Sequence, residues 1–203
     1  MGIHGHNNIK LLRMNNDNRL LTYIFTIIKL FLFVGLGAGL LFGIVQSLRT
    51  SSISGLIDGI TFGAILALIT VPIVTILDIF ERVRCYLKYK IVDFGVIQER
   101  RFLTKTDYDI AFKKIFDILN EIKKMEVTHK DSKQGVIEAL VKRSWKSFGE
   151  KIRIELSKNA KGEIEASLTS KPRITLTAID YCKNLENVEM IMQYVNRAFN
   201  TNI

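Results

Sequence analysis

Two hydrophobic runs decide the fold of this chain: LFLFVGLGAGLLFGIVQSL at residues 30–48 and GLIDGITFGAILALITVPIVTIL at residues 55–77. Each run has roughly 20 residues, and a helix that rises about 1.5 Å per residue would carry it across a hydrocarbon layer about 30 Å thick. Only a short polar turn separates the two runs. The pattern therefore predicts a membrane helical hairpin, with two transmembrane helices over residues 30–80.

Glycine recurs at every fourth position in both runs. The residues are Gly35, Gly39 and Gly43 in the first run, and Gly55, Gly59 and Gly63 in the second. Positions four apart lie along one stripe of a helix, and glycine lets two helices approach closely in lipid. Two interpretations are open. The ladders pack the helices of one hairpin against each other, or they pack against neighbouring subunits of a homo-oligomer or membrane complex.

Two carboxylates lie in or beside the second run. Asp58 is expected in the first turn of its helix, where the positive end of the helix dipole favours a negative charge. A structural role there is one interpretation, and a role at a pore or interface is the other, because carboxylates within membrane spans are often functional. Asp78 follows the second run directly and is expected to be a solvated boundary residue.

Basic residues flank the hairpin on both sides. Lys10, Arg13, Arg19 and Lys29 precede it, Arg82, Arg84, Lys88 and Lys90 follow it, and the turn carries only Arg49. Since basic residues are retained in the cytoplasm, both termini are expected to be cytoplasmic. Residues 1–29 would be a cytoplasmic leader, and its apolar part at 20–29 either extends the first span or lies in the interface as an amphipathic helix. Residues 81–94 would be a basic juxtamembrane connector. Its four basic side chains are predicted to contact anionic lipid headgroups.

Residues 95–203 have the patterns of a small folded domain with both strands and helices. Strands are expected at 96–103, 135–145, 151–157, 163–170 and 173–179, and apolar residues alternate with polar ones along the second, third and fourth of these segments. Thr106 or Asp107 can cap a helix that continues to about Ile122, and a last helix is expected over 184–199. The predicted fold class is a two-helix membrane hairpin plus a cytoplasmic α+β domain, whose antiparallel sheet is packed by two helices on one side.

The composition gives no indication of catalysis, cofactors or metal. Cys85 and Cys182 do not form a zinc-binding spacing, and two histidines in a polar leader, His4 and His6, are poor metal ligands alone. The acid–base candidates Glu150, Asp180 and His129 match no known catalytic pattern. We expect Asp180 to cap or brace the last helix. Trp145 is expected to anchor the core or a hairpin, and the alternative is an exposed aromatic side chain that contacts lipid or a partner. The formal net charge of +9 is dispersed among acids, so we predict no nucleic-acid partner.

Two segments carry a resemblance to a known group of proteins. They are GVIEALVKRSWKSFGEKIRIEL at 135–156 and TSKPRITLTAIDYCKNLENVEMI at 169–191. Both resemble uncharacterised bacterial two-span membrane proteins with a C-terminal α+β domain of unknown function, over roughly the last hundred residues. The resemblance implies a bacterial cytoplasmic membrane and no assigned activity. It also implies that Trp145, Phe148, Gly149, Glu150, Asp180 and Asn184 form a structural signature.

Three functions are compatible with these patterns. The first is a non-enzymatic integral membrane protein that self-associates or joins partners through its glycine ladders and presents its α+β domain to the cytoplasm. The second is a small homo-oligomeric channel. The third is a membrane-anchored module that binds lipid or a small ligand, which rests on fold analogy alone.

Overall fold

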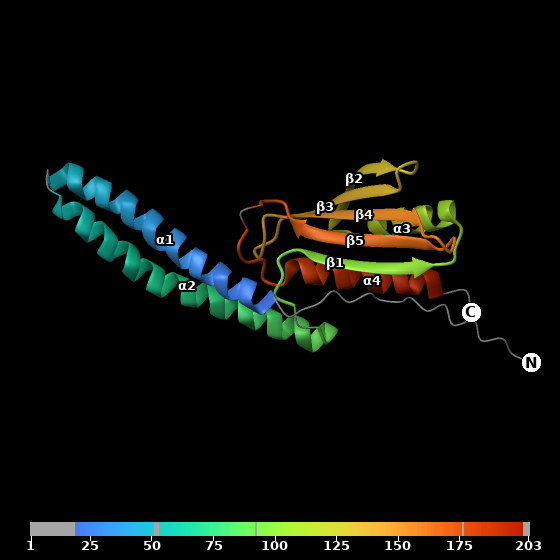
Figure 1. The fold of residues 1–203 in the computed structure, drawn as a ribbon, viewed down its shortest axis with the longest axis horizontal. Helices are drawn as coiled ribbons and strands as arrows, with labels where there is room; N and C mark the ends of the chain where they lie inside the picture. The colour runs from blue at the N-terminus through green and yellow to red at the C-terminus, as the bar shows by residue number, and fades with distance from the viewer. Residues whose placement is uncertain (1–18, 51–52, 92, 176, 201–203) are drawn as a thin grey trace, which may run out of the picture. The chain divides into compact units, whose positions relative to one another are not determined.

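The computed structural model describes residues 19–50, 53–91, 93–175 and 177–200, and the predicted leader up to residue 18 lies outside this range. The chain divides into two compact units (Figure 1). One is a helical hairpin that extends to Gly95, and the other is a domain that begins at Val96. Two long apolar helices followed by an α+β domain were predicted from the sequence, and this order is confirmed.

The hairpin consists of α1 (Arg19–Thr50) and α2 (Ser54–Tyr89), which lie side by side along their lengths (Figure 1). Both helices are long and apolar enough to cross a membrane, by length and composition. Helix α1 includes residues 20–29, which agrees with the alternative that they extend the first span. Helix α2 continues beyond the predicted limit at Leu77, because backbone hydrogen bonding, and not hydrophobicity alone, decides where a helix ends. Most of the predicted connector at 81–94 is therefore helical, and α2 ends at Lys90 in a left-handed conformation.

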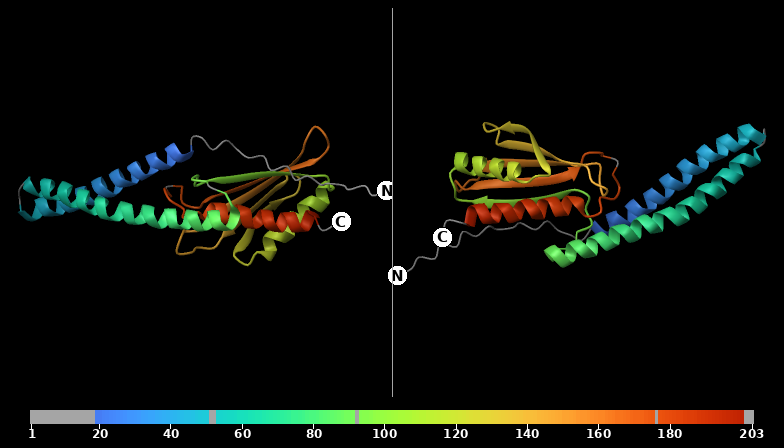
Figure 2. Two further views of the ribbon diagram at one scale, coloured as in Figure 1. Left: turned by 90° about the horizontal axis from the view of Figure 1, so that it is seen from below. Right: turned by 180° about the vertical axis from the view of Figure 1, so that it is seen from behind.

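The domain contains five strands and two helices. In chain order they are β1 (Gln98–Thr104), α3 (Tyr108–Glu121), β2 (Met125–Asp131), β3 (Val136–Val141), β4 (Glu150–Lys158), β5 (Ile164–Pro172) and α4 (Lys183–Asn200). The strands form one antiparallel sheet in the order β1-β5-β4-β3-β2. Helices α3 and α4 contact each other and pack on the sheet, as two further views show (Figure 2). The predicted antiparallel sheet with helices is confirmed.

The core lies between the sheet and its two helices. Ile152, Ile154 and Leu156 alternate along β4 and are buried, whereas Arg153 and Glu155 point to the opposite, open face. Burial of one such aliphatic side chain is worth roughly 1.5–3 kcal/mol. The side chain of Asp107 accepts a hydrogen bond of 2.9 Å from the Asp109 amide, so it caps α3 as predicted.

The strands predicted from the sequence were wrong at two places. Strand β2 was missed because it is a polar edge strand whose register shifts between Val127 and His129, which breaks the alternating pattern. The segment 173–179 was predicted as a strand, but its described residues form a loop. Pro172 is the last residue that pairs with β4, opposite Glu150, and the chain then turns between Ile174 and Thr177.

Candidate functional site

The two glycine ladders face each other inside the hairpin. Gly39 and Gly43 of α1 lie against the backbone of Gly59 and Gly55 of α2, and Gly63 lies against Gly35 and Gly39. We call these six residues, Gly35, Gly39, Gly43, Gly55, Gly59 and Gly63, the glycine seam. Ala67 and Val71 continue it along α2 and are buried. In this structure, the first of the two interpretations accounts for both ladders.

The seam has no room for side chains. A Cβ atom on Gly59 would lie 2.6 Å from the amide nitrogen of Gly43, and one on Gly39 would lie 2.9 Å from the carbonyl oxygen of Gly59. Both distances would force the backbones apart. Gly37 lies off the seam, and a Cβ atom there would meet nothing within 4 Å. Glycine at the seam is thus required by close helix approach, as in membrane helix pairs.

A group of buried polar side chains closes one end of the hairpin. Asp78 is fully buried, and its Oδ2 accepts hydrogen bonds from the Tyr23 hydroxyl at 2.6 Å and from Arg82 Nε at 2.7 Å. Arg82 Nη1 also donates to the carbonyl oxygen of Asp93 at 2.6 Å. The guanidinium lies over the rings of Tyr23 and Phe94, 5.0 Å and 5.2 Å from their centroids. We call Tyr23, Asp78, Arg82, Asp93 and Phe94 the Asp78 clasp.

The Asp78 clasp corrects two predictions. Asp78 is not a solvated boundary residue, and Arg82 is not positioned to contact lipid headgroups, because both are buried and bonded to each other. Arg82 lies one turn after Asp78, so the pair itself has a spacing that could be read from the sequence. Their partner Tyr23 is 55 residues away from Asp78 and cannot be found from local spacing.

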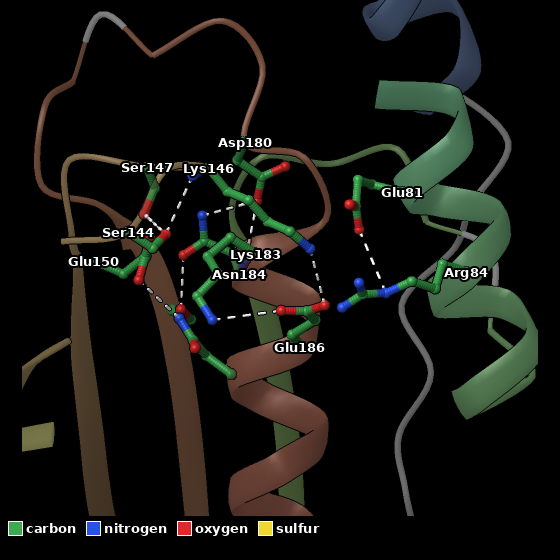
Figure 3. Close-up of polar contacts among 12 residues, drawn as sticks. Glu81, Arg84, Ser144, Lys146, Ser147, Glu150, Asp180, Lys183, Asn184 and Glu186 are labelled. Atoms are coloured by element: carbon green, nitrogen blue, oxygen red, sulfur yellow. Dashed lines mark hydrogen bonds and ion pairs between the residues drawn. The ribbon is translucent and has the colours of Figure 1, made fainter. Parts of the chain in front are cut away.

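The other predicted residues of the hairpin are exposed. Arg84, Lys88 and Lys90 lie on or just after the last turns of α2, and Arg84 forms an ion pair of 3.5 Å with Glu81 (Figure 3). Their contact with lipid headgroups stays a prediction. Asp58 is also exposed, but α2 has no acidic residue in its first turn, so Asp58 begins the second turn and the predicted position was wrong by one residue.

In the α+β domain, a polar network connects the start of α4 to the sheet (Figure 3). Asp180 Oδ2 accepts hydrogen bonds from the backbone and side-chain nitrogens of Asn184, both at 2.9 Å, so Asp180 braces α4 as predicted. Asn184 Oδ1 accepts from the Ser170 hydroxyl of β5 at 2.7 Å. One turn later, Asn187 Nδ2 donates to Glu150 Oε2 of β4 at 3.2 Å. These buried side chains fix α4 to two central strands.

An ion-paired group lies at the edge of this network. Glu186 accepts hydrogen bonds from Lys146 Nζ at 3.3 Å and from Lys183 Nζ at 3.4 Å. Burial by itself would raise the pKa of Glu186, but the two ammonium groups outweigh burial and lower the pKa below its ordinary value. The negative charge also lies in the first turn of α4, where the helix dipole favours it. Lys146 thereby holds the loop between β3 and β4 against α4.

The predicted signature residues divide into two groups. The structure brings Glu150, Asp180 and Asn184 into the buried network, whereas Trp145 and Phe148 are 72% and 64% exposed. Trp145 is therefore not a core anchor, and its exposure agrees with the alternative of an aromatic side chain on the surface. In the loop 142–149, the side chain of Lys146 points inward and forms an ion pair with Glu186, whereas the side chain of Trp145 is exposed.

The acid–base candidates do not converge on one site. Glu150 and Asp180 are buried and bonded to asparagine side chains, whereas His129 is exposed on the edge strand β2, opposite Glu138. Among the residues that the structure describes, no group of three or more His, Cys, Asp or Glu side chains could hold a metal ion. The hydrogen bonds of Glu150 and Asp180 in this network hold α4 on the sheet.

The comparisons with known proteins leave the resemblance as a prediction: the sequence matches no protein-family model, and no curated protein matches it.

Proposed function

We propose that this chain is a non-enzymatic integral membrane protein, in which the hairpin crosses the bacterial cytoplasmic membrane and holds the α+β domain at the cytoplasmic face. The observation that carries the proposal is the distribution of side chains on the hairpin. Glycines fill its inside, and large apolar side chains cover its outside, among them Phe33, Leu40 and Leu68. Only 11% and 17% of the residues in the most apolar windows of the two helices are buried.

This distribution supports a lipid environment on physical grounds. A helix in the core of a soluble protein buries its apolar face, and a soluble monomer seldom exposes a continuous apolar surface. Over the described part of the hairpin there is no such buried face of large residues, so water would have to contact most of its leucine, isoleucine and phenylalanine side chains. In lipid the same side chains face a solvent of their own polarity, and close contact between the glycine backbones holds the helices together.

Self-association remains part of the proposal, but the glycine seam is not its best candidate surface. Within one hairpin, the glycine ladder of α1 already packs against that of α2. Contacts between copies would therefore use the outward faces of α1 and α2. The prediction that subunits join through the ladders is tested directly by the glycine variants described in the Discussion.

Lysine substitutions on the outer face test the membrane anchor. A lysine near the middle of a membrane helix costs about 2.5–3.5 kcal/mol, whereas one near a helix end can reach the interface. We expect Leu40→Lys combined with Leu68→Lys to reduce the fraction of full-length chain that stays in membranes after an alkaline carbonate wash. Leu48→Lys, two residues before the end of α1, is the matched control and should remain in the membrane.

The wild-type result is equally informative. The unmodified chain should resist the carbonate wash and float with membranes in a density gradient. Release of the wild type by carbonate, or equal retention of the Leu40→Lys/Leu68→Lys variant and the wild type, would contradict a membrane-spanning hairpin.

A further inference from the structure

Two adjoining loops of the α+β domain expose apolar side chains among basic ones. Trp145 and Phe148 belong to the loop between β3 and β4, and Ile174 follows β5 and is 44% exposed. The basic side chains of Lys142, Arg143, Lys171 and Arg173 are exposed in the same two segments. We call these seven residues the loop patch. The two loops are joined by a hydrogen bond of 3.0 Å from the Arg173 amide to the carbonyl oxygen of Gly149.

The β3–β4 loop is built in a way that keeps Trp145 outside. The amide of Ser144 donates to the carbonyl oxygen of Ser147 at 3.0 Å, which folds the loop tightly around Trp145 and Lys146. The Ser144 and Ser147 hydroxyl oxygens accept further bonds from the Lys146 and Gly149 amides, at 3.3 Å and 3.4 Å. Lys146 turns inward to Glu186 (Figure 3). Its neighbour Trp145 is exposed.

Gly149 completes this shape. Its φ of +99° is a conformation that side chains rarely tolerate, and a Cβ atom there would lie 2.8 Å from the carbonyl oxygen of Val141. The backbone can therefore return into β4 directly after Phe148 only because residue 149 is glycine. Exposure of the two aromatic rings thus results from a fixed loop shape and an inward ion pair, which makes it a property of the fold.

Within the two segments that carry these side chains, the exposed charges are all positive. The sequence segments 142–149 and 171–179 contain no Asp or Glu. The acids that follow each segment, Glu150 and Asp180, are buried in the network below the loops. The exposed surface of the loop patch therefore offers indole, phenyl and butyl groups together with four cations. Tryptophan in a cationic surround is typical of protein surfaces that lie in the headgroup region of a membrane.

We propose that the loop patch docks on an anionic lipid surface, with Trp145 and Phe148 in the boundary between headgroups and acyl chains. The four cations would then lie among phosphate groups, where anionic lipid attracts them. The inference rests on the proposed membrane anchor, because only residues 90–97 separate α2 from β1 and would keep the domain within reach of the bilayer.

Trp145 is the only tryptophan in the chain, so its fluorescence reports on the loop patch without any substitution. The full chain would be reconstituted in nanodiscs of pure phosphatidylcholine, and of equal parts phosphatidylcholine and phosphatidylglycerol. We expect bluer emission and less quenching by acrylamide in the anionic discs. Lipids brominated near the glycerol should quench the emission there, and rising salt should weaken the effect because it screens the headgroup charge.

Two charge-reversal variants test whether the basic residues of the loop patch cause this change in Trp145 emission. Lys142→Glu with Arg143→Glu should restore a red-shifted, acrylamide-accessible emission in the anionic discs. Lys158→Glu with Lys161→Glu is the control, because these exposed lysines lie at or just beyond the other end of β4 from Glu150, and it should behave as the wild type. Circular dichroism of each variant would verify that the domain is folded.

The outcomes separate the docking from the anchor. A chain that fails to co-purify with discs of either composition would contradict the proposed membrane anchor. A chain that enters the discs but keeps Trp145 equally exposed in both lipids, unquenched by bromine, would overturn the docking alone. Emission that is shielded in both lipids without bromine quenching would indicate a protein contact, such as a second copy, and would also overturn it.

Discussion

The hairpin and the α+β domain place their large apolar side chains in opposite ways. In the domain, branched aliphatic side chains such as Ile152 and Ile154 fill the inside, and charged residues lie on the open face of the sheet. In the hairpin, the inside is glycine backbone and the outside is leucine, isoleucine and phenylalanine. This difference supports the proposed membrane anchor, since large apolar side chains belong inside in water but can face outward in lipid.

The two units also bury polar groups differently. The Asp78 clasp buries an ion pair at one end of the hairpin, whereas the domain buries amide and carboxyl groups that connect α4 to β4 and β5. Each arrangement joins segments that are distant in the sequence. Substitutions at the clasp, the seam and the network therefore test how much each unit depends on its own mode of packing.

The largest expected effect comes from Asp78→Leu. This change leaves the buried guanidinium of Arg82 without its carboxylate, and loss of one partner of a buried pair costs about 3–5 kcal/mol. We expect the hairpin of the full chain to lose helicity at a much lower fraction of sodium dodecyl sulfate in mixed micelles, as followed by circular dichroism.

Two controls sharpen this prediction. Replacing both partners, as Asp78→Leu with Arg82→Met, should recover part of the lost stability, because the buried guanidinium is no longer present without its carboxylate. Asp58→Leu removes an exposed carboxylate from the same helix and should change the transition by less than about 0.5 kcal/mol. A large effect at Asp58 would instead favour its role at a pore or interface.

The next largest effect is expected at the seam. Gly59→Leu places a side chain where a Cβ atom already lies within 2.6 Å of the Gly43 amide, and overpacking of this kind costs about 1–3 kcal/mol. Since the seam closes one hairpin, the variant should unfold more easily in detergent while its native mass stays that of the wild type. Thermal unfolding and native mass spectrometry measure these two properties.

Gly37→Leu is the matched control for the seam. It makes the same change in α1 at a position where nothing lies within 4 Å, so both measurements should stay at wild-type values. A smaller native mass for Gly59→Leu would show that the ladder joins subunits. Equal behaviour of the Gly59 and Gly37 variants would mean that the seam contributes nothing to packing.

The smallest effect concerns the domain and is pH dependent. Lys146 and Lys183 lower the pKa of Glu186 in the folded chain. The ion pairs therefore stabilise the domain fully above the pKa of an unfolded glutamate, about 4.3, and this stabilisation is lost as pH falls through the lower pKa of the folded state. Glu186→Gln should cost about 1 kcal/mol at neutral pH and flatten the decline in acid.

Urea unfolding at pH values from about 3 to about 6 measures how the free energy of unfolding of the domain depends on pH. Glu126→Gln is the control, because Glu126 is exposed on the edge strand β2 and should leave the acid profile unchanged. A Glu186→Gln profile with the wild-type slope would exclude Glu186 as a contributor to acid stability.

Local periodicity predicted much of this fold. The alternation along β4 and β5 and the spacing of apolar residues in α3 and α4 are local patterns, and the structure confirms them. Strand β2 is too polar and irregular to give such a pattern, since it pairs only with β3 at the edge of the sheet. The segment 173–179 has the residues of a strand but lacks a neighbouring strand after Pro172.

The polar sites were harder to predict for a different reason. The Asp78 clasp depends on Tyr23, and the network depends on pairs such as Glu150 and Asn187, which only the tertiary fold brings together. The exposure of Trp145 depends on hydrogen bonds within a tight loop, and the hydrophobicity of the sequence cannot predict these bonds. The glycine ladders were visible in the sequence, but their partner was not, because spacing alone does not say which helix faces them.

The most direct test of the anchored architecture is the accessibility of two introduced cysteines on intact cells. Thr50→Cys at the end of α1 and Lys161→Cys in the β4–β5 turn would be made separately in a chain whose buried Cys85 and Cys182 are replaced by alanine. A membrane-impermeant thiol reagent should label position 50 on intact cells, and position 161 only after the membrane is permeabilised. Labelling of position 161 on intact cells, or no difference between the positions, would contradict a hairpin that holds the domain at the cytoplasmic face.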